Sequence, residues 1–173
     1  MSKFWMASGL TMTVLLSACS SLGGGAYPTQ ANLQPTRGNA AQGAVQLRQE
    51  GDGVVLLAKV SGLTPGAHGF HIHEKGDCSA PDGTSAGGHF NPTAKPHGHP
   101  GHGDHHSGDL PQLVADASGN ATLEARLSGV DLGTGPLGIA GRSFVIHAAP
   151  DDFTSQPAGN SGPRIACGVI PAS

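Results

Sequence analysis

Short runs in which apolar and polar positions alternate recur along the chain from residue 31 onward. Val45 and Leu47 alternate with Gln46 and Arg48 inside the run 43–49, which is the pattern of a half-buried β-strand. A Glu-Gly-Asp-Gly turn follows, and after it comes the apolar run 54–60. The two runs and the turn between them predict a β-hairpin.

Six further short strands are predicted. They cover residues 31–35, 67–74, 112–116, 121–127, 143–147 and 165–170. In the fourth of these Leu123, Ala125 and Leu127 alternate with polar residues, and a Ser-Gly-Asn turn precedes it. We therefore expect a second hairpin that pairs 112–116 with 121–127.

Two long segments, 75–110 and 148–163, lack this alternation. Loops of that length in compact domains are usually functional or disordered. No segment has the apolar period of an amphipathic helix, and 28 glycines and 13 prolines favour turns over helices. The expected fold is therefore all-β: an eight-stranded antiparallel Greek-key sandwich or flattened barrel with two long functional loops.

Length and charge narrow the classes of function. A chain of 173 residues corresponds to one domain, and the net charge of −3 offers no basic surface for nucleic acid. Residues 1–18 consist of a short basic start and a mostly apolar run that is too short to span a membrane as a mature helix. They are expected to be a signal peptide.

The end of that segment reads Leu-Ser-Ala-Cys and resembles the lipobox of bacterial lipoproteins. The resemblance implies that Cys19 carries the lipid anchor, with the protein held to a membrane in the periplasm or cell envelope. Residues 19–30 then form a flexible tether, and residues 31–173 form the folded domain. The alternative is an ordinary signal peptide in which Cys19 is incidental.

Two cysteines remain, Cys78 and Cys167. In an oxidising compartment an even pair is most simply a disulfide. It would close a long loop and stabilise the fold by roughly 4–5 kcal/mol in the chain-entropy model. The alternative is two free buried thiols.

Eight of the ten histidines lie within residues 70–109, a segment with few apolar residues for a core. Ordering such a segment needs something other than apolar burial, and a bound metal is the candidate. His71 and His73 stand two apart in a predicted strand, so their imidazoles point to the same face and can meet one ion. The alternative is a pair of surface histidines. His147, at the end of a predicted strand, becomes a further candidate ligand for that ion.

A second ligand set follows in the pattern H-x7-H-x8-H-x2-D. Its members are His89, His97, His106 and Asp109. Three imidazoles and one carboxylate suit a tetrahedral zinc ion. The alternative is a histidine-rich tract that binds metal loosely, and three further histidines keep it open: His99, His102 and His105.

Four segments carry a family resemblance: 69–74 reads GFHIHE, 88–92 reads GHFNP, 106–110 reads HSGDL, and 164–170 reads RIACGVI. Together and in this order they resemble the copper/zinc superoxide dismutase family. The lipobox, and Ala148 directly after His147, make the chain similar to the bacterial periplasmic branch.

The resemblance implies ligands for two ions. Copper would be held by His71, His73, His89 and His147. Zinc would be held by His89, His97, His106 and Asp109. His89 would bridge both ions as an imidazolate, and Asp151 would accept hydrogen bonds from one histidine of each site. The resemblance also implies the Cys78–Cys167 disulfide.

The implied activity is conversion of superoxide into O2 and hydrogen peroxide through Cu(II)/Cu(I) cycling, with a structural zinc. Arg164 would attract and orient the substrate anion beside the copper and, with His89, make up the catalytic residues. Lys75 and Lys95 are weaker candidates for steering it. Relatives of this kind are monomers or dimers, so a homodimer is one of two expected states.

The alternative function is an exported copper/zinc storage or carrier protein on the same fold. Such a protein has no need of Arg164, and that arginine favours the enzyme. The spare histidines near residue 100 suggest one hypothesis, capture of scarce metal for delivery inward, and one plain alternative, a tolerated polar loop.

Overall fold

A computed structural model describes residue 1 and residues 28–172. Its strands are β1 (Thr29–Pro35), β2 (Gln42–Glu50), β3 (Gly53–Ser61), β4 (Gly66–His68), β5 (Phe70–His73), β6 (Leu113–Ala115), β7 (Ala121–Ser128), β8 (Ser143–His147) and β9 (Arg164–Val169). The described residues contain one short 3-10 helix, η1 (Thr84–Ala86), and none of their helices has the length and apolarity to cross a membrane. Cys19 and the rest of the expected signal peptide lie outside the described residues.

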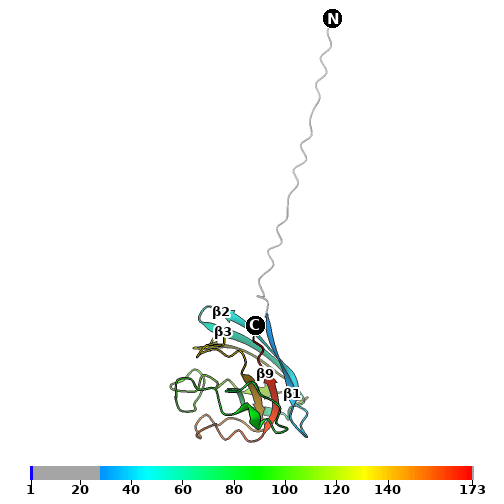
Figure 1. Cartoon of the computed structure of the whole chain (residues 1–173). Helices are drawn as coiled ribbons and strands as arrows, with labels where there is room; N and C mark the ends of the chain where they lie inside the picture. Colours follow the sequence, from blue (N-terminus) through cyan, green and yellow to red (C-terminus); the bar gives the residue numbers. More distant parts are fainter. Residues whose placement is uncertain (2–27, 173) are drawn as a thin grey trace.

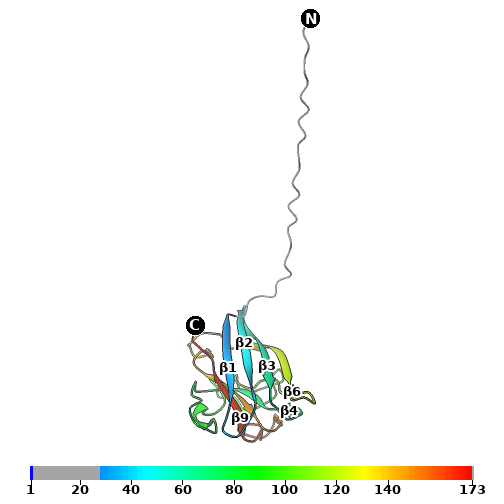
Figure 2. The same ribbon diagram turned by 90° about the vertical axis from the view of Figure 1, so that its right-hand side faces the viewer.

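Every strand pair is antiparallel. Seven strands form one curled sheet in the order β5-β8-β9-β1-β2-β3-β7, while β4 and β6 form a small second sheet. Figure 2 shows β1, β2 and β3 side by side at the front of the curled sheet, with β9 crossing beside β1. The predicted all-β antiparallel fold is confirmed, and the hairpin of β2 and β3 forms as expected.

The core is filled by the inward positions of these strands. Val45 and Leu47 have no exposed surface, as their alternation with polar residues predicts. The rings of Phe70 and Phe144 stack with centroids 5.4 Å apart and join β5 to β8 from the inside. The strands β5 and β8 are thus fixed by apolar packing on the face opposite to their histidines His71, His73 and His147.

The predicted strand 67–74 is divided in two at Gly69. Its first part, β4, pairs with β6, whereas its second part, β5, pairs with β8. Gly69 instead bonds to the end of β8 and the segment after it: its N–H donates to the Ala149 carbonyl and its carbonyl accepts from the His147 N–H, both at 2.9 Å. A Cβ at this position would lie 2.6 Å from the Ser161 hydroxyl, so the close approach requires glycine.

The predicted hairpin between 112–116 and 121–127 is wrong. A turn does form there, closed by the Asp116 N–H donating to the Asn120 carbonyl at 2.9 Å. However, β6 pairs with β4, and β7 pairs along its whole length with β3. The chain leaves one sheet for the other at this turn. β1 also begins two residues before the expected start of the first strand.

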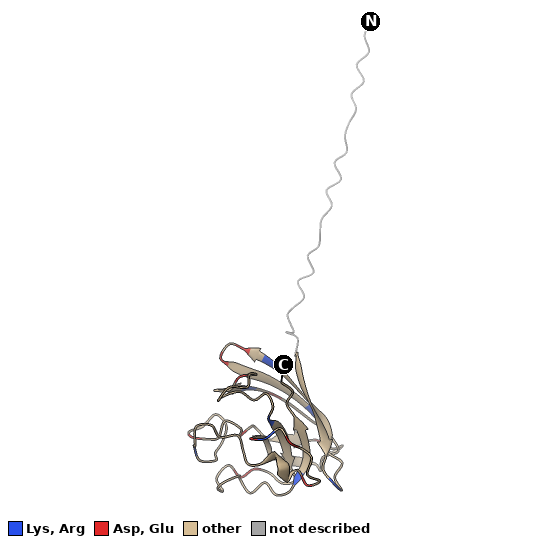
Figure 3. Cartoon of the chain, in the orientation of Figure 1, with Lys and Arg blue, Asp and Glu red and all other residues tan. Residues whose placement is uncertain are grey.

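The two long loops lie together in the lower part of Figures 1 and 2, below β2 and β3. The Cys78–Cys167 disulfide, predicted from the sequence, is present and ties the first loop to β9 across 89 residues. Charged side chains are sparse, and Figure 3 shows acidic ones at the turn between β2 and β3, where Arg126 pairs with Glu50 and Asp52.

Candidate metal centre

Strand pairing brings three histidines together. His71 and His73 lie on β5, and His147 ends β8, the strand that pairs with β5. His89 joins them from the long loop through an isolated bridge to His73. We call His71, His73, His89 and His147 the strand cluster; one ligand atom from each lies within 4.8 Å of all the others.

In each ring of the strand cluster one nitrogen is hydrogen-bonded, and the other, which we call open, has no partner among the described residues. The Nδ1–H groups of His73 and His147 donate to the carbonyls of Gly87 and Gly162, at 2.9 and 3.0 Å. The opposite nitrogens are buried and have no hydrogen-bond partner among the described residues: His71 Nδ1, His73 Nε2, His89 Nε2 and His147 Nε2. Four open, buried nitrogens that converge are an arrangement that an ion would complete, because unpaired buried polar atoms are otherwise unfavourable.

Burial keeps three of these rings neutral. It lowers the pKa of His73 to about 2, of His147 to about 3 and of His89 to about 4, and neighbouring imidazoles add to the effect. At neutral pH the open nitrogens of these three rings therefore carry lone pairs rather than protons. A metal does not have to displace a proton to bind them.

The second cluster is built around one carboxylate. We call His89, His97, His106 and Asp109 the loop cluster; their ligand atoms also lie within 4.8 Å of one another. Asp109 Oδ1 lies 2.9, 3.0 and 3.2 Å from the Nδ1 atoms of His89, His97 and His106. Burial alone would raise the pKa of Asp109, but hydrogen bonds from His106 and His89 hold that pKa well below its ordinary value. The loop cluster thus contains a fixed negative charge, and the strand cluster contains none.

Asp151 joins the two clusters. Its Oδ2 accepts from His71 Nε2 at 2.6 Å, and its Oδ1 accepts from His97 Nε2 at 2.9 Å. The Phe153 N–H donates to the same Oδ1 at 2.7 Å and holds the carboxylate in place. Burial opposes ionisation, but these hydrogen bonds lower the pKa of Asp151, so it is an acceptor at neutral pH.

Two glutamines that the sequence analysis did not single out hold the loops at this site. The Gln156 side chain pairs with both backbone groups of His97, accepting from its N–H and donating to its carbonyl, each at 2.9 Å. Gln112 makes the same two-bond contact with the backbone of Asp151, each bond at 3.1 Å. No local pattern marks either residue, because their partners lie 59 and 39 positions away.

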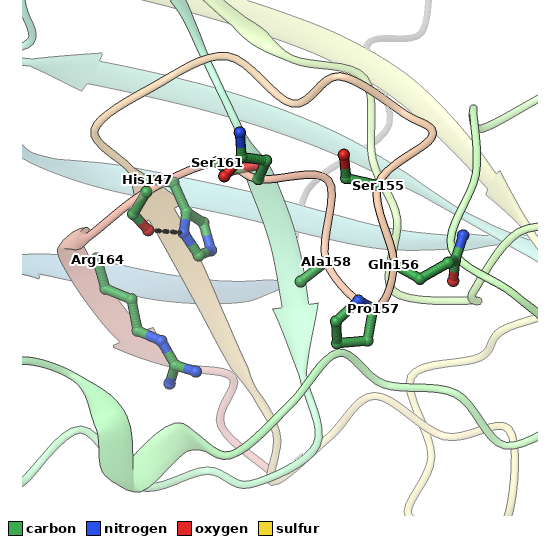
Figure 4. A pocket seen from close by; sticks show the side chains of 9 residues that line it. His147, Ser155, Gln156, Pro157, Ala158, Ser161 and Arg164 are labelled. Carbon is green, nitrogen blue, oxygen red and sulfur yellow. Dashed lines mark hydrogen bonds between the residues drawn. The ribbon is translucent and has the colours of Figure 1, made fainter.

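Arg164 lies beside the strand cluster. Its guanidinium donates to the carbonyls of Gly83 and Gly87, both at 2.7 Å, and the Gly87 carbonyl is also the partner of His73. Arg164 and His147 line the same pocket of about 430 Å³, and Arg164 is the one Lys or Arg among its lining residues. Figure 4 shows the His147 ring and the Arg164 guanidinium on one side of this pocket, with Ser155 to Ala158 on the other.

The remaining predicted residues lie outside both clusters. His99 and His102 are exposed, and His105 is half-buried, with its Nδ1 bonded to the His106 carbonyl at 2.7 Å. Lys95 is paired with Asp104 at 3.0 Å. Neither Lys95 nor Lys75 lines the pocket that holds Arg164.

Known proteins resemble this chain in sequence. The family model described as copper/zinc superoxide dismutase matches residues 41–170. A relative from Caulobacter vibrioides, named superoxide dismutase [Cu-Zn], is 45% identical over 134 residues, which cover 74% of this chain and 77% of the relative. Superoxide dismutase [Cu-Zn] 2 of Aquifex aeolicus is 42% identical over 133 residues, covering 74% and 78%.

Solved structures agree with the fold. The crystal structure of a SOD-like protein from Bacillus subtilis superposes with a TM-score of 0.76 at 37% identity, covering 84% of this chain and 99% of that one. A double mutant of a SOD-like protein from the same organism gives a TM-score of 0.74 at 39% identity, with coverage of 82% and 96%.

Proposed function

Because this chain belongs to the copper/zinc superoxide dismutase family, we propose that its strand cluster is the copper site and its loop cluster is the zinc site of that enzyme. The protein is a superoxide dismutase with copper and zinc as cofactors. The observation that carries the assignment is the set of four open, buried nitrogens in the strand cluster.

The donor atoms of each cluster support the assignment of copper to the strand cluster and zinc to the loop cluster. Four imidazoles without a carboxylate suit copper, for which nitrogen donors are preferred. Three imidazoles with Asp109 suit zinc, which accepts a tetrahedral shell of nitrogen and oxygen ligands. His89 directs Nε2 to the first cluster and Nδ1 to the second, so it would be the ligand shared by both ions.

When bound, copper supplies the one-electron exchange with superoxide by alternating between Cu(II) and Cu(I), and zinc stays in one oxidation state. The chain supplies binding and orientation. Arg164 presents its guanidinium to the pocket that His147 also lines, so an anion that enters meets the positive charge next to the strand cluster. The Gly83 and Gly87 carbonyls fix that guanidinium, which limits the orientations of the bound anion.

Burial lowers the pKa of Arg164, and the nearby Asp82 carboxylate opposes this shift. The group remains a cation at neutral pH. Because the chain carries a net charge of −3, attraction of superoxide depends on a local field, and Arg164 is the source of that field in the pocket.

A storage or carrier protein is less well supported. Such a protein needs ligands, but it needs no cation beside them and no open pocket that reaches them. Arg164 and its pocket next to His147 therefore favour catalysis.

The test combines metal analysis with a superoxide assay on the purified protein. We expect about one copper and one zinc per chain, with activity, and His71→Ala should lose both copper and activity while keeping zinc. Zinc alone with no activity in the unchanged protein would contradict the proposal and favour the binding protein. Activity that survives in His71→Ala would contradict the ligand assignment.

The N-terminal residues carry a second proposal, that residues 1–18 are a lipoprotein signal peptide and residues 19–30 a tether. Under it, Cys19 carries a lipid that anchors the domain of residues 31–173 in the periplasm or cell envelope. Incorporation of labelled fatty acid tests this: label should be present in the unchanged chain and absent in Cys19→Ser. Sedimentation of the domain then distinguishes a monomer from the homodimer that the family resemblance allows.

A further inference from the structure

Two histidines that belong to neither cluster form a pair on the surface of the first long loop. His99 and His102 are both exposed, their Nδ1 atoms lie 3.0 Å apart and their ring centroids lie 4.7 Å apart. We propose that His99 and His102 form an accessory surface site for a divalent transition-metal ion, with Cu(II) as its preferred occupant. This site is separate from the copper and zinc sites proposed above.

The backbone brings the two rings together before any ion binds. His99-Pro100-Gly101-His102 is a turn closed by the His102 N–H donating to the His99 carbonyl at 3.1 Å. Proline in the second position and glycine with φ of 94° in the third suit a type II turn. The side chains of the first and fourth residues are therefore neighbours, and little conformational entropy remains to be lost on binding.

Contacts on both sides hold this turn in place. The Phe153 ring packs against His99 with centroids 4.5 Å apart. Lys95 and Asp104 form an ion pair at 3.0 Å across the base of the turn. Just inside it a Cβ on Gly98 would lie 2.3 Å from the Asp104 carbonyl oxygen, so the two arms of the loop run close together. The pair is thus carried on a closed and supported segment.

The nitrogen separation favours Cu(II). Two nitrogens bound about 2.0 Å from an ion lie about 2.8 Å apart at the right angle of a tetragonal Cu(II) shell, but about 3.3 Å apart at the tetrahedral angle of Zn(II). The observed separation of 3.0 Å is nearer to the first value. Copper also stands above zinc in general affinity for imidazole donors. Water would fill the remaining positions, because both rings are exposed.

The competing explanation is a simple hydrogen bond in which one imidazole N–H donates to the other ring. His105 provides the comparison, since it lies on the same loop and its Nδ1 is already bonded to the His106 carbonyl at 2.7 Å. It is not paired with His99 or His102. It lines a pocket to which the turn contributes Pro100 and Gly101 but neither of these two histidines. A general histidine-rich attraction for metal would involve His105 equally, whereas a two-residue site would not.

The experiment uses the full chain with its copper and zinc sites already filled. Divalent copper is added in a buffer that contains glycine as a weak competing chelator, and bound metal is measured by equilibrium dialysis. Broadening of assigned imidazole signals by paramagnetic copper, followed by NMR, identifies the residues that bind it. The variants are His99→Gln, His102→Gln and both together, with His105→Gln as the matched control.

The unchanged protein should take up one additional copper and lose the His99 and His102 signals first. Removal of a direct ligand should weaken that binding by at least about tenfold, since loss of a group that merely orients a ligand already costs this much. His105→Gln should bind as the unchanged protein does, and all variants should keep their dismutase activity.

Absence of an additional copper, or uptake by the double variant equal to that of the unchanged protein, would overturn the site. If His105→Gln lost as much copper binding as the His99 and His102 variants, the loop would bind copper unspecifically and the two-residue site would be wrong. Zinc that binds this site as tightly as copper would overturn the preference for Cu(II). Each of these results is independent of whether the internal clusters have been assigned correctly.

Discussion

One histidine cluster stands on paired strands of the sheet, whereas the other stands on the loop 75–110. The strand cluster gains its positions from the backbone ladder of β5 and β8 and from the stacked phenylalanines behind it. The loop cluster has no such ladder. Single backbone bridges place Asp109 opposite His71 and His89 opposite His73, and side chains supply the remaining support, among them Asp109, Asp151 and Gln156. Loss of the strand cluster therefore requires disruption of the sheet, whereas the loop cluster is sensitive to the loss of single side-chain contacts.

Asp109→Asn should have the largest effect, because Asp109 supplies the only negative charge of the loop cluster, lies within 3.2 Å of the Nδ1 atoms of three imidazoles and accepts from two backbone N–H groups. We expect zinc content to fall to below about a tenth of an equivalent, with a loss of at least about 10 °C in the unfolding temperature of the metal-loaded protein. Metal analysis and calorimetry measure both.

The control for this change is Asp104→Asn, which removes an exposed carboxylate of the same loop from its ion pair with Lys95. Zinc content should be unchanged, since exposed ion pairs contribute about 0–1 kcal/mol. A full equivalent of zinc in Asp109→Asn would show that the loop holds the ion without its carboxylate.

Removal of the disulfide should come next in size. The bond spans 89 residues and anchors the loop that carries Gly83 and Gly87 to the strand that carries Arg164. The double change Cys78→Ser and Cys167→Ser should lower the free energy of unfolding of the metal-free protein by about 4–5 kcal/mol in the chain-entropy model. Urea denaturation measures this loss. If the two free energies of unfolding differ by less than about 1 kcal/mol, other contacts must already restrict this loop in the unfolded chain.

Acidification should act mainly through the strand cluster. The folded pKa values of His73, His89 and His147 are about 2, 4 and 3, below the ordinary 6.5, so the unfolded chain takes up protons first as the pH falls. Stability of the metal-free protein is therefore present above pH 6.5 and declines below it, by about 2 kcal/mol or more between pH 6.5 and pH 5. The lowered pKa of Asp109 acts only below its ordinary 3.8, outside this window.

Urea midpoints at a series of pH values, with metal removed, measure this decline. His73→Gln should flatten it, because a neutral amide replaces one of the rings that resists protonation. A stability that is constant from pH 7 to pH 5 would show that the strand cluster takes up protons as readily as an unfolded chain does.

Gln156→Ala should have the smallest effect, and it should separate the two clusters. The change removes both hydrogen bonds to the His97 backbone, at a cost of about 1–3 kcal/mol. The affinity for zinc should fall about tenfold, as is usual for loss of a group that orients a ligand, while the affinity for copper stays within about twofold of the unchanged protein. Competition with a chromophoric chelator measures each metal, and Gln30→Ala, on the exposed side of β1, is the control. Equal weakening of both metals would mean that the two clusters share one support.

The sequence predicted most of the fold and both groups of histidines for a physical reason. Alternation records which face of a strand is buried, and the H-x-H spacing in β5 places two rings on one face. Alternation does not show which strands pair with one another. The residues 112–116 and 121–127 are adjacent in sequence with a turn between them, yet they pair with β4 and β3 because those strands offer the matching edges.

The supporting residues were also hidden from sequence reasoning. Gln112 and Gln156 act through contacts with backbone groups far away in the chain, and any polar side chain at those positions looks alike in a sequence. The sequence also does not show that His99 and His102 form a pair without His105. That difference depends on which neighbour each ring contacts rather than on the spacing of the three residues.

Asp151 touches an imidazole of each cluster, one with each oxygen, and so has consequences for how the sites report on one another. If an ion left the loop cluster, a change in the orientation of His97 would reach His71 through this carboxylate. The colour and magnetic resonance of copper depend on the orientation of its ligands. With copper bound at the strand cluster as proposed, its spectrum would therefore also report how much of the loop cluster is occupied by colourless zinc.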